Sequence, residues 1–285
     1  MITSAKSLGF SDEAEARDRC QMQFLAQLMR QGAARYILKG GMAMRALYGS
    51  ARLTKDIDFD CESSVSAASM KANMPRALEH AARATGLINP AVVQTKKGDL
   101  SNKWRLDGSL AEGTRVTFDV EISRRGVPDD AYVTTLAIQP PYEYRITAFV
   151  VRVYTEVAMA AGKVNALLSE NRNVPRDVYD LYDLSRRRAD PSGLWSAQLP
   201  REVLKRKREL VWAKVDGIRF DQANSELLPY IPPDLRATID EARWDEMRTE
   251  VAEQVVKWLD VAIPRARTAE EMNHDPKSDA DLAGR

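Results

Sequence analysis

The sequence predicts an α/β (α+β) fold, in which a mixed sheet with flanking helices is followed by a helical domain. Residues 56–59 and 115–122 alternate polar and apolar side chains, as half-buried strands do. Segments with helical periodicity lie before and between them, which is expected when helices flank a sheet. Residues 140 and 141 are both prolines. After them, helical periodicity and charged residues dominate the chain.

The first domain is predicted to span residues 1–142. Ser11 is a favourable N-cap for its first helix, and Gly86 ends a later one. Pro75 lies inside that later helix and predicts a kink or a split. The expected elements, in chain order, are a helix at 12–31, a strand at 35–38, helix 42–48, strand 56–59, helix 66–85, and strands 91–95, 102–107, 114–122 and 131–139.

The second domain, residues 143–264, is expected to contain helices only. Its helices are predicted at 147–170, 176–188, 200–215 and 235–261, and no strand is expected after residue 142. Residues 265–285 are polar and poor in apolar side chains, so a disordered tail is predicted there.

Composition excludes several classes of protein. The 285 residues are 44% hydrophobic and carry a formal net charge of only +1, so any nucleic-acid partner must meet a local basic patch. Two cysteines argue against a disulfide framework, and two histidines argue against imidazole catalysis or a histidine zinc site. No apolar run approaches the roughly 18 residues of a membrane span, so a soluble cytoplasmic protein without a membrane partner is expected.

The segment from Lys39 to Asp60 contains the main candidate site. Alternation places Asp56 and Asp58 on one strand face, about 7 Å apart. Hard carboxylate oxygens suit Mg²⁺, which keeps several waters and takes substrate phosphates as further ligands. Gly40 and Gly41 precede a short helix, where backbone amides can approach a triphosphate. Taken singly, the acidic pair also fits a solvated strand end, and the glycine pair a simple turn.

Residues 115–122 place Thr117, Asp119 and Glu121 on the polar face of a strand. Asp119 is therefore a candidate third carboxylate beside Asp56 and Asp58. The alternative is a solvated strand face that Asp119 shares with Glu121.

These residues together resemble the nucleotidyltransferase superfamily, and within it the AbiEii/AbiGii toxin family, which includes the mycobacterial MenT toxins. The resemblance implies a nucleotidyltransferase-type mixed sheet and a catalytic metal site formed by Asp56, Asp58 and Asp119. It also implies nucleotide binding by Lys39, Gly40, Gly41, Arg52 and Lys55. Met42 departs from the family pattern, which has a hydroxyl residue there. The matching residues are Lys39, Gly40, Gly41, Ala43, Arg52, Thr54, Asp56, Ile57, Asp58 and Phe59.

A second block lies in the helical half, with Lys163 followed by Arg176, Asp177 and Asp180. From the residues alone, a surface ion-pair network between two helices explains it. The same family continues with a helical lysine and an Arg-Asp-x-Tyr-Asp-Leu segment. The resemblance therefore implies that Lys163 contacts the triphosphate, that Lys163 and Asp180 take part in catalysis, and that Arg176 and Asp177 line the nucleotide pocket.

Two basic runs follow, Arg186-Arg187-Arg188 and Lys205-Arg206-Lys207-Arg208. They are candidates for binding the phosphates of an RNA acceptor. A solvated helix face explains them equally well.

The function expected from the resemblance is that of a toxin in a toxin–antitoxin, or abortive infection, system. It would use Mg²⁺ or Mn²⁺ and an NTP substrate, and transfer NMP to an RNA acceptor, expected to be the tRNA 3′ end, so blocking translation. The active site is expected in the cleft between the domains, and the partner is a cognate antitoxin protein. The alternatives are a protein or small-molecule acceptor, a catalytically silent nucleotide-binding module, and a purely structural role of both blocks.

Overall fold

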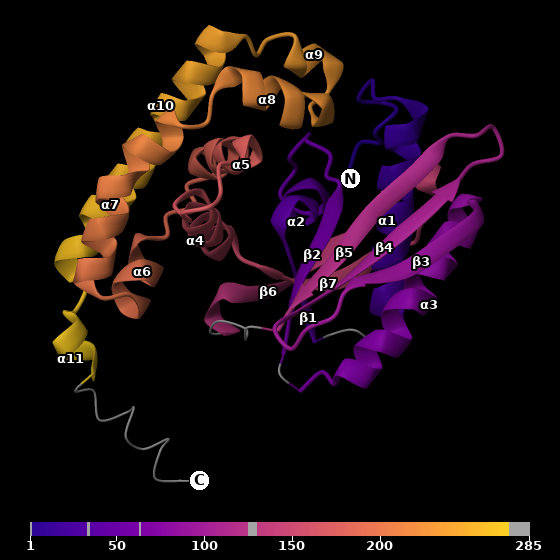
Figure 1. Ribbon diagram of the computed structural model, residues 1–285, viewed down its shortest axis with the longest axis horizontal. Coiled ribbons are helices and arrows are strands. Elements are labelled where there is room, and N and C mark those ends of the chain that lie inside the picture. The colour runs from indigo at the N-terminus through magenta and orange to yellow at the C-terminus, as the bar shows by residue number, and fades with distance from the viewer. Residues whose placement is uncertain (1, 33–34, 63, 125–129, 274–285) are drawn as a thin grey trace. The chain divides into compact units, whose positions relative to one another are not determined.

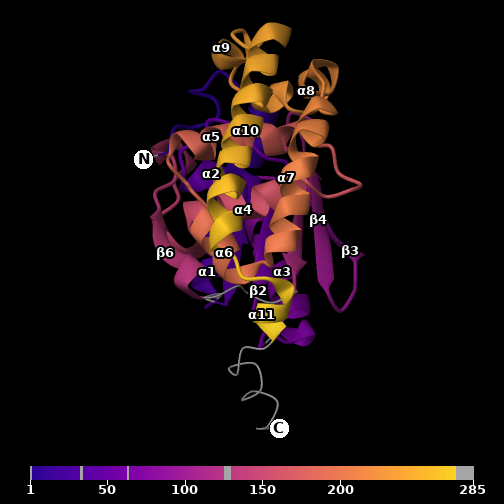
Figure 2. The ribbon, with the colours of Figure 1, turned by 90° about the vertical axis from the view of Figure 1, so that its left-hand side faces the viewer.

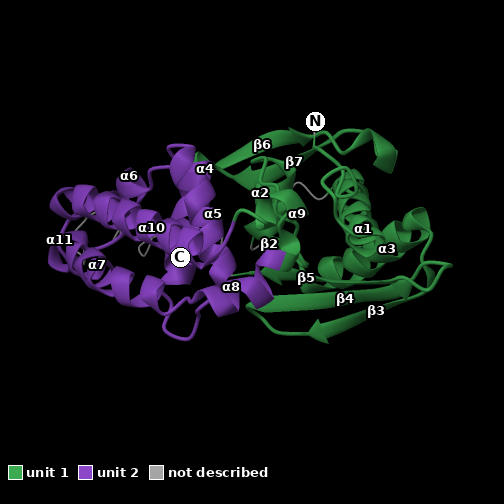
Figure 3. Cartoon of the chain, turned by 90° about the horizontal axis from the view of Figure 1, so that it is seen from above, with its two compact units in different colours: residues 1–155, 229–238 green, residues 156–228, 239–285 purple. Residues whose placement is uncertain are grey.

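The computed structural model describes residues 2–32, 35–62, 64–124 and 130–273. Figure 3 shows the two compact units into which the chain divides. Unit 1 comprises Met1–Thr155 and Pro229–Thr238, and unit 2 comprises Glu156–Leu228 and Ile239–Arg285. Unit 1 thus continues beyond residue 142, and it also includes the short segment Pro229–Thr238 from later in the chain.

Unit 1 contains a seven-stranded sheet (Figure 1). The sequence predicts a mixed sheet, but with six of these strands and without β7. Among the described residues, the strand order is β3-β4-β5-β2-β1-β7-β6. The β1–β7 and β2–β5 pairs are parallel and the other neighbours are antiparallel. The strands are β1 (Tyr36–Lys39), β2 (Asp56–Cys61), β3 (Ile88–Lys96), β4 (Ser101–Ser109), β5 (Arg115–Ser123), β6 (Val133–Ile138) and β7 (Phe149–Tyr154).

Helices α1 and α3 pack against each other and against the sheet (Figure 1). Phe24 of α1 meets Phe118 of β5 edge to face, with ring centroids 6.4 Å apart. This leaves the polar side of β5 uncovered by α1. Ser11 caps α1 as predicted, and Pro75 lies within α3 without splitting it. The unit's helices are α1 (Asp12–Arg30), α2 (Gly40–Ala46), α3 (Ala67–Thr85) and α9 (Pro233–Arg236), with 3-10 turns η1 (Asp130–Tyr132) and η2 (Tyr142–Tyr144).

The prediction of a single helix at 147–170 is wrong in its first half. Residues Phe149–Tyr154 form β7, which pairs with β1 and β6, and α4 begins only at Glu156. The run Phe-Val-Val-Arg-Val-Tyr is rich in β-branched residues, which favour strands. Its apolar residues run directly into those of the following helix, which hides the boundary from a periodicity search.

Unit 2 is helical. In Figure 2, α7 and α10 lie side by side, and their residues are in contact. Trp244 of α10 is fully buried and donates a hydrogen bond from Nε1 to the Ile218 carbonyl at 3.1 Å. The elements are α4 (Glu156–Leu167), α5 (Pro175–Arg186), α6 (Ser192–Gln198), α7 (Arg201–Asp216), α8 (Phe220–Glu226), α10 (Glu241–Ala262), α11 (Ala269–Asn273), η4 (Ile263–Arg265) and η3 (Leu228–Tyr230), which joins the two units.

The predicted disordered tail begins too early. Residues 265–273 include the end of η4 and all of α11, and Arg201 holds this segment. Its backbone amide donates to the Arg267 carbonyl at 2.9 Å, and its Nε donates to the Ala266 carbonyl at 3.1 Å. The rest of the predicted tail, 274–285 with His274, lies outside the described residues. Among those that are described, no helix is long and apolar enough to cross a membrane.

Candidate active site

Strand β2 carries the acidic face that its sequence predicts. Asp56, Asp58 and Asp60 are half-buried, while the intervening residues and Cys61 are buried. The strict alternation confirms that Asp56 and Asp58 lie on one face. Asp60 extends the same face and was missed from the sequence, although the alternation could have revealed it.

The neighbouring strands place further polar residues beside this face. Lys39 of β1 is in register with Asp58, and Asp119 of β5 is in register with Asp56. The sheet therefore brings Asp119 next to Asp56, as predicted. Lys39 ends β1 and α2 begins at Gly40, so the start of α2 lies on the β1 side of Asp58.

The two glycines at the start of α2 are required by the side chains that lie against them. Gly40 has φ +67°, and a Cβ there would lie 2.5 Å from Oδ2 of Asp58. A Cβ on Gly41 would lie 2.7 Å from Oγ1 of Thr54 and 2.8 Å from Nη2 of Arg52. Only residues without side chains allow this close approach. Met42, the departure from the family pattern, is fully buried in the core.

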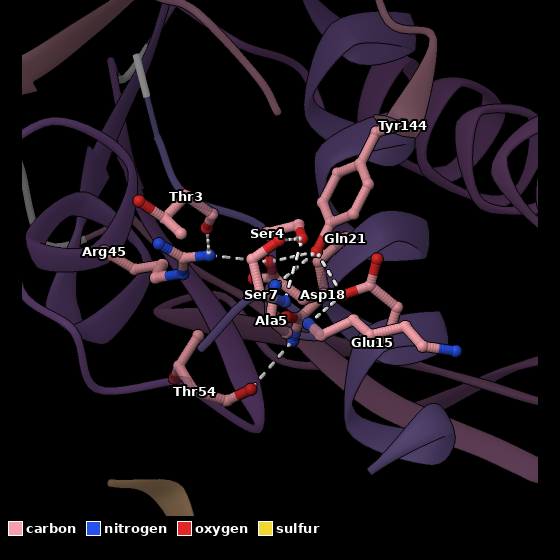
Figure 4. Close-up of polar contacts among 11 residues, drawn as sticks. Thr3, Ser4, Ala5, Ser7, Glu15, Asp18, Gln21, Arg45, Thr54 and Tyr144 are labelled. Atoms are coloured by element: carbon pink, nitrogen blue, oxygen red, sulfur yellow. Dashed lines mark hydrogen bonds and ion pairs between the residues drawn. The ribbon is translucent and has the colours of Figure 1, made fainter. Parts of the chain in front are cut away.

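A buried polar network links α1, α2, Thr54 and Tyr144 and so supports the site (Figure 4). Gln21 of α1 donates to the Thr54 carbonyl at 3.2 Å, just before β2 begins. Asp18 of α1 pairs with Arg45 of α2 at 3.0 Å and accepts a 2.7 Å hydrogen bond from the Tyr144 hydroxyl. Burial, followed by the charge of Asp18, raises the pKa of Tyr144, so the phenol remains a donor. The network fixes α1 and α2 relative to the acidic strand.

Lys39, a predicted nucleotide-binding residue, forms an ion pair with Asp60 in the structure. Its Nζ lies 2.6 Å from Oδ1 of Asp60, and the Tyr154 hydroxyl donates to Oδ2 at 2.7 Å. Burial and the Asp60 carboxylate raise the pKa of Tyr154. Arg52, predicted for the same role, is buried and donates from Nη1 to the Leu53 carbonyl at 2.9 Å.

Both oxygens of Asp119 are engaged by cations. Arg105 donates from Nε to Oδ1 at 2.8 Å and from Nη2 to Oδ2 at 3.0 Å, and Nζ of Lys103 lies 2.9 Å from Oδ2. Burial alone would raise the pKa of Asp119, but the hydrogen bonds from Arg105 and Lys103 outweigh it and hold the pKa below its usual range.

The described part of the chain contains no cluster of three or more His, Cys, Asp or Glu side chains arranged to hold a metal ion. Asp56 and Asp58 remain as a donor set of two carboxylates on one strand face. This set fits Mg²⁺, which proteins usually bind through one or two carboxylates together with substrate phosphates. Both oxygens of Asp119, the third predicted ligand, are bound by Arg105 and Lys103.

A pocket of about 490 Å³ opens beside Asp56 and Asp119 in unit 1. Nζ of Lys55 lies 5.0 Å from the centre of the Tyr230 ring, and the Arg17 guanidinium lies 5.7 Å from it. Lys55 was predicted for the site, whereas most of the other lining residues were not. The pocket is lined by Glu13, Arg17, Lys55, Asp56, Arg105, Arg115, Thr117, Phe118, Asp119 and Tyr230.

The second sequence block forms a buried ion-pair network within unit 2. Nζ of Lys163 lies 3.0 Å from Oδ1 of Asp177 and 2.6 Å from Oδ2 of Asp180, and both carboxylates are fully buried. Arg172 binds the other oxygen of Asp177 at 2.7 Å. Burial would raise the pKa of Asp177, but Lys163 and Arg172 outweigh it and lower the pKa. Arg176 is half-buried beside them.

The basic runs are only partly available to a partner. Arg186 stacks on the Tyr182 ring at 4.5 Å, and Nη1 of Arg187 lies 3.8 Å from Oε1 of Glu156. Lys207 donates to Asn165, and Arg208 pairs with Asp260. Three further cations of the runs are exposed, namely Arg188, Lys205 and Arg206.

A family model described as "Nucleotidyl transferase AbiEii toxin, Type IV TA system" matches residues 23–269. No curated protein sequence gives a significant match. The fold is similar to that of JHP933 from Helicobacter pylori, with TM-score 0.53, 16% identity, and coverage of 94% of this chain and 98% of that chain.

Two further solved structures share the fold. A putative nucleotidyltransferase from H. pylori has TM-score 0.54 and 16% identity over 93% of this chain and 100% of its own. MenT4, a nucleotidyltransferase toxin from Mycobacterium tuberculosis, has TM-score 0.52 and 17% identity over 93% of this chain and 98% of its own. At these identities, the likenesses concern the fold.

Proposed function

Because the chain belongs to the AbiEii family of nucleotidyltransferase toxins of type IV toxin–antitoxin systems, we propose that it transfers NMP from an NTP to the 3′ hydroxyl of an RNA. The family match confirms the resemblance seen in the sequence. It makes an NTP the substrate and an antitoxin the partner. The tRNA 3′ end is the acceptor we propose, since a nucleotide added there would block aminoacylation and so translation.

One observation supports this proposal most: the Asp58 carboxylate lies directly against Gly40, beside Asp56 on the same strand face. Asp56 and Asp58 would hold the divalent ion, Mg²⁺ or Mn²⁺. When bound, the ion would stabilise charge on the phosphate oxygens during the displacement. Gly40 and Gly41 leave room for phosphate groups to approach the backbone at the start of α2.

The transfer forms a bond from the acceptor hydroxyl oxygen to the α-phosphorus. The bond from that phosphorus to the bridging oxygen breaks, and pyrophosphate leaves with the electron pair. We assign Asp56 to accept the hydroxyl proton, because Asp56 lines the pocket beside the acidic face. Asp119, which is hydrogen-bonded to Arg105 and paired with Lys103, is assigned to orient these two cations.

The residues of unit 2 enter the proposal through the family block. Lys163 is held between two buried carboxylates, so its ammonium is fixed in place. We propose that it compensates the charge of the triphosphate, with Asp180 positioning it, while Arg176 and Asp177 line the nucleotide pocket. The exposed cations Arg188, Lys205 and Arg206 are proposed to contact RNA phosphates.

Incubation of the protein with each radiolabelled NTP, a divalent ion, total bacterial RNA and total bacterial protein tests the proposal. Label is expected in RNA and to depend on the ion. Label in protein or in small molecules alone would overturn the choice of RNA as acceptor. An absence of pyrophosphate release with every NTP would overturn catalysis altogether.

A further inference from the structure

The pocket beside Asp56 is lined by more cations than carboxylates. Four cationic side chains line it, against three carboxylates. Three of these cations come from β4, β5 and the segment before β2, and Arg17 comes from α1. All of its lining residues belong to unit 1. A pocket of this size with a surplus of positive charge suits an anionic group.

Each of these cations is held in place by a second residue of the same unit. Asp119 binds Arg105 through two hydrogen bonds of 2.8 and 3.0 Å. Asp107 binds Arg115 through two hydrogen bonds of 2.9 and 2.5 Å. Preorganised side chains lose less entropy when a ligand binds, which is a common feature of built binding sites.

Tyr230 performs the same task for the remaining pair. The ammonium of Lys55 and the guanidinium of Arg17 both lie over its ring, at 5.0 and 5.7 Å from the centroid. Tyr230 belongs to the segment Pro229–Thr238 that returns to unit 1. Its backbone carbonyl accepts a hydrogen bond from the Leu53 amide at 2.9 Å, which fixes the ring beside the strand that carries Asp56.

Arg17 is the most deeply buried of these cations. Its side chain is only 14% exposed, and its ion pair with Glu13 is long, at 3.4 Å. Burial lowers the pKa of Arg17, although the guanidinium remains charged. A partly desolvated cation attracts an added anion more strongly than an exposed one does.

The position of the pocket in the sheet indicates which substrate it binds, the RNA acceptor or the NTP donor. Gly40 approaches Asp58 from the β1 side of β2, while Asp119 and Arg105 lie on the β5 and β4 side. Asp56 lines the pocket, and Asp58 and the two glycines are absent from its described lining. In an in-line displacement, the attacking and leaving oxygens lie on opposite sides of the phosphorus. With pyrophosphate leaving towards the glycines, the acceptor enters from the pocket.

We propose that this pocket binds the phosphodiester of the acceptor's 3′-terminal nucleotide. The proposal rests on the proposed function, in which an RNA hydroxyl is the nucleophile. Arg17, Lys55, Arg105 and Arg115 contact the phosphate and bring the terminal sugar up to Asp56. Contacts to phosphate carry no sequence information, so this pocket does not select a particular base.

The test uses the full chain and a short single-stranded RNA with a 5′ fluorescent label and a free 3′ hydroxyl. Binding is followed by anisotropy at several salt concentrations, and NTP binding is measured separately by calorimetry. The variant is the double substitution Arg105→Gln and Arg115→Gln, both at exposed side chains. Arg76→Gln, an exposed arginine on α3, is the matched control for loss of surface charge.

We expect the double variant to bind the RNA at least about tenfold more weakly, the loss typical of one charge-assisted hydrogen bond. The log–log salt slope should flatten by roughly 0.7 for each RNA phosphate that the variant no longer neutralises. NTP affinity and the melting temperature should match those of the Arg76→Gln control. Should the double variant fail to fold, Lys55→Gln, at another exposed side chain, replaces it.

Weaker NTP binding with unchanged RNA binding would assign the pocket to the donor triphosphate and overturn the proposal. Equal binding of RNA by the variant and the control would overturn it as well. A wild-type chain that binds no RNA at any salt concentration would instead overturn the proposed RNA acceptor itself. The salt series therefore separates a failure of the pocket assignment from a failure of the proposed function.

Discussion

Replacing Gly40 with alanine tests whether the backbone at the start of α2 positions the Asp58 carboxylate. Two costs follow from the structure. A left-handed φ of +67° costs an alanine about 1–2 kcal/mol. The added Cβ would also lie 2.5 Å from Oδ2 of Asp58, where ordinary contact begins at 3.4 Å. The carboxylate must therefore move by about 1 Å, and a misplacement of that size costs about 100-fold in rate.

The matched control is Gly86→Ala. Gly86 caps α3 with φ +84°, and a Cβ there would meet no atom within 4 Å. Both variants should lose about 1–2 kcal/mol, which lowers the melting temperature by about 2–8 °C in a unit of this size. Only Gly40→Ala should lose about 100-fold in the rate of pyrophosphate release. Equal rates for the two variants would refute the positioning role of Gly40.

Four other predictions follow from the same contacts. Asp58→Asn should reduce transfer by about 10³-fold, because several kcal/mol of charge stabilisation depend on the metal ligand, and the melting curve should not change. Asp119→Asn should raise the RNA concentration for half-maximal rate without changing that for NTP; a fall in the saturating rate alone would instead give Asp119 a chemical role. Lys163→Met should destabilise the protein by about 3–5 kcal/mol, since it leaves buried carboxylates without their partner; an unchanged denaturant midpoint would contradict this. The pKa of Asp177 is lowered in the folded protein, so its ionised carboxylate stabilises the fold at pH values above the unfolded pKa of about 3.9. This stabilisation is lost as pH falls through the folded pKa. Acidification from about pH 5 to about pH 3 should therefore lower the melting temperature of the wild type more than that of Asp177→Asn.

The acidic strand could be predicted because its information is local. Alternation alone places Asp56 and Asp58 on one face, and the structure confirms it. The same local pattern in β4, where Lys103 and Arg105 alternate with Trp104, contained the signal for the cations that hold Asp119. The alternation was interpreted for Asp56 and Asp58, but Lys103 and Arg105 were not predicted as site residues.

Other features depend on contacts between distant segments. Tyr230 reaches the pocket only because Pro229–Thr238 returns to unit 1, and no local pattern announces that return. Strand β7 was missed because its short apolar run merges with the start of α4. The contact between Gly40 and Asp58 depends on the register of β1 with β2, which the sequence does not reveal.

In the second sequence block, the motif predicts which charged residues meet, but it does not predict how deeply they are buried. The sequence predicts Lys163, Asp177 and Asp180 on adjacent helices, and they do meet. Their complete burial could not be inferred from the residues, because charged side chains are normally exposed. Burial makes the network important for stability, so activity and stability must be measured together in its variants.

The most direct test of nucleotidyl transfer to an RNA 3′ hydroxyl compares intact tRNA with periodate-oxidised tRNA as acceptors. Periodate converts the terminal 2′,3′-diol to a dialdehyde and leaves the rest of the molecule in place. Transfer to the 3′ hydroxyl predicts that radiolabelled NMP from the preferred NTP enters intact tRNA, that oxidised tRNA takes up none, and that Asp58→Asn labels neither. Equal labelling of intact and oxidised tRNA, or label found only in protein, would contradict it.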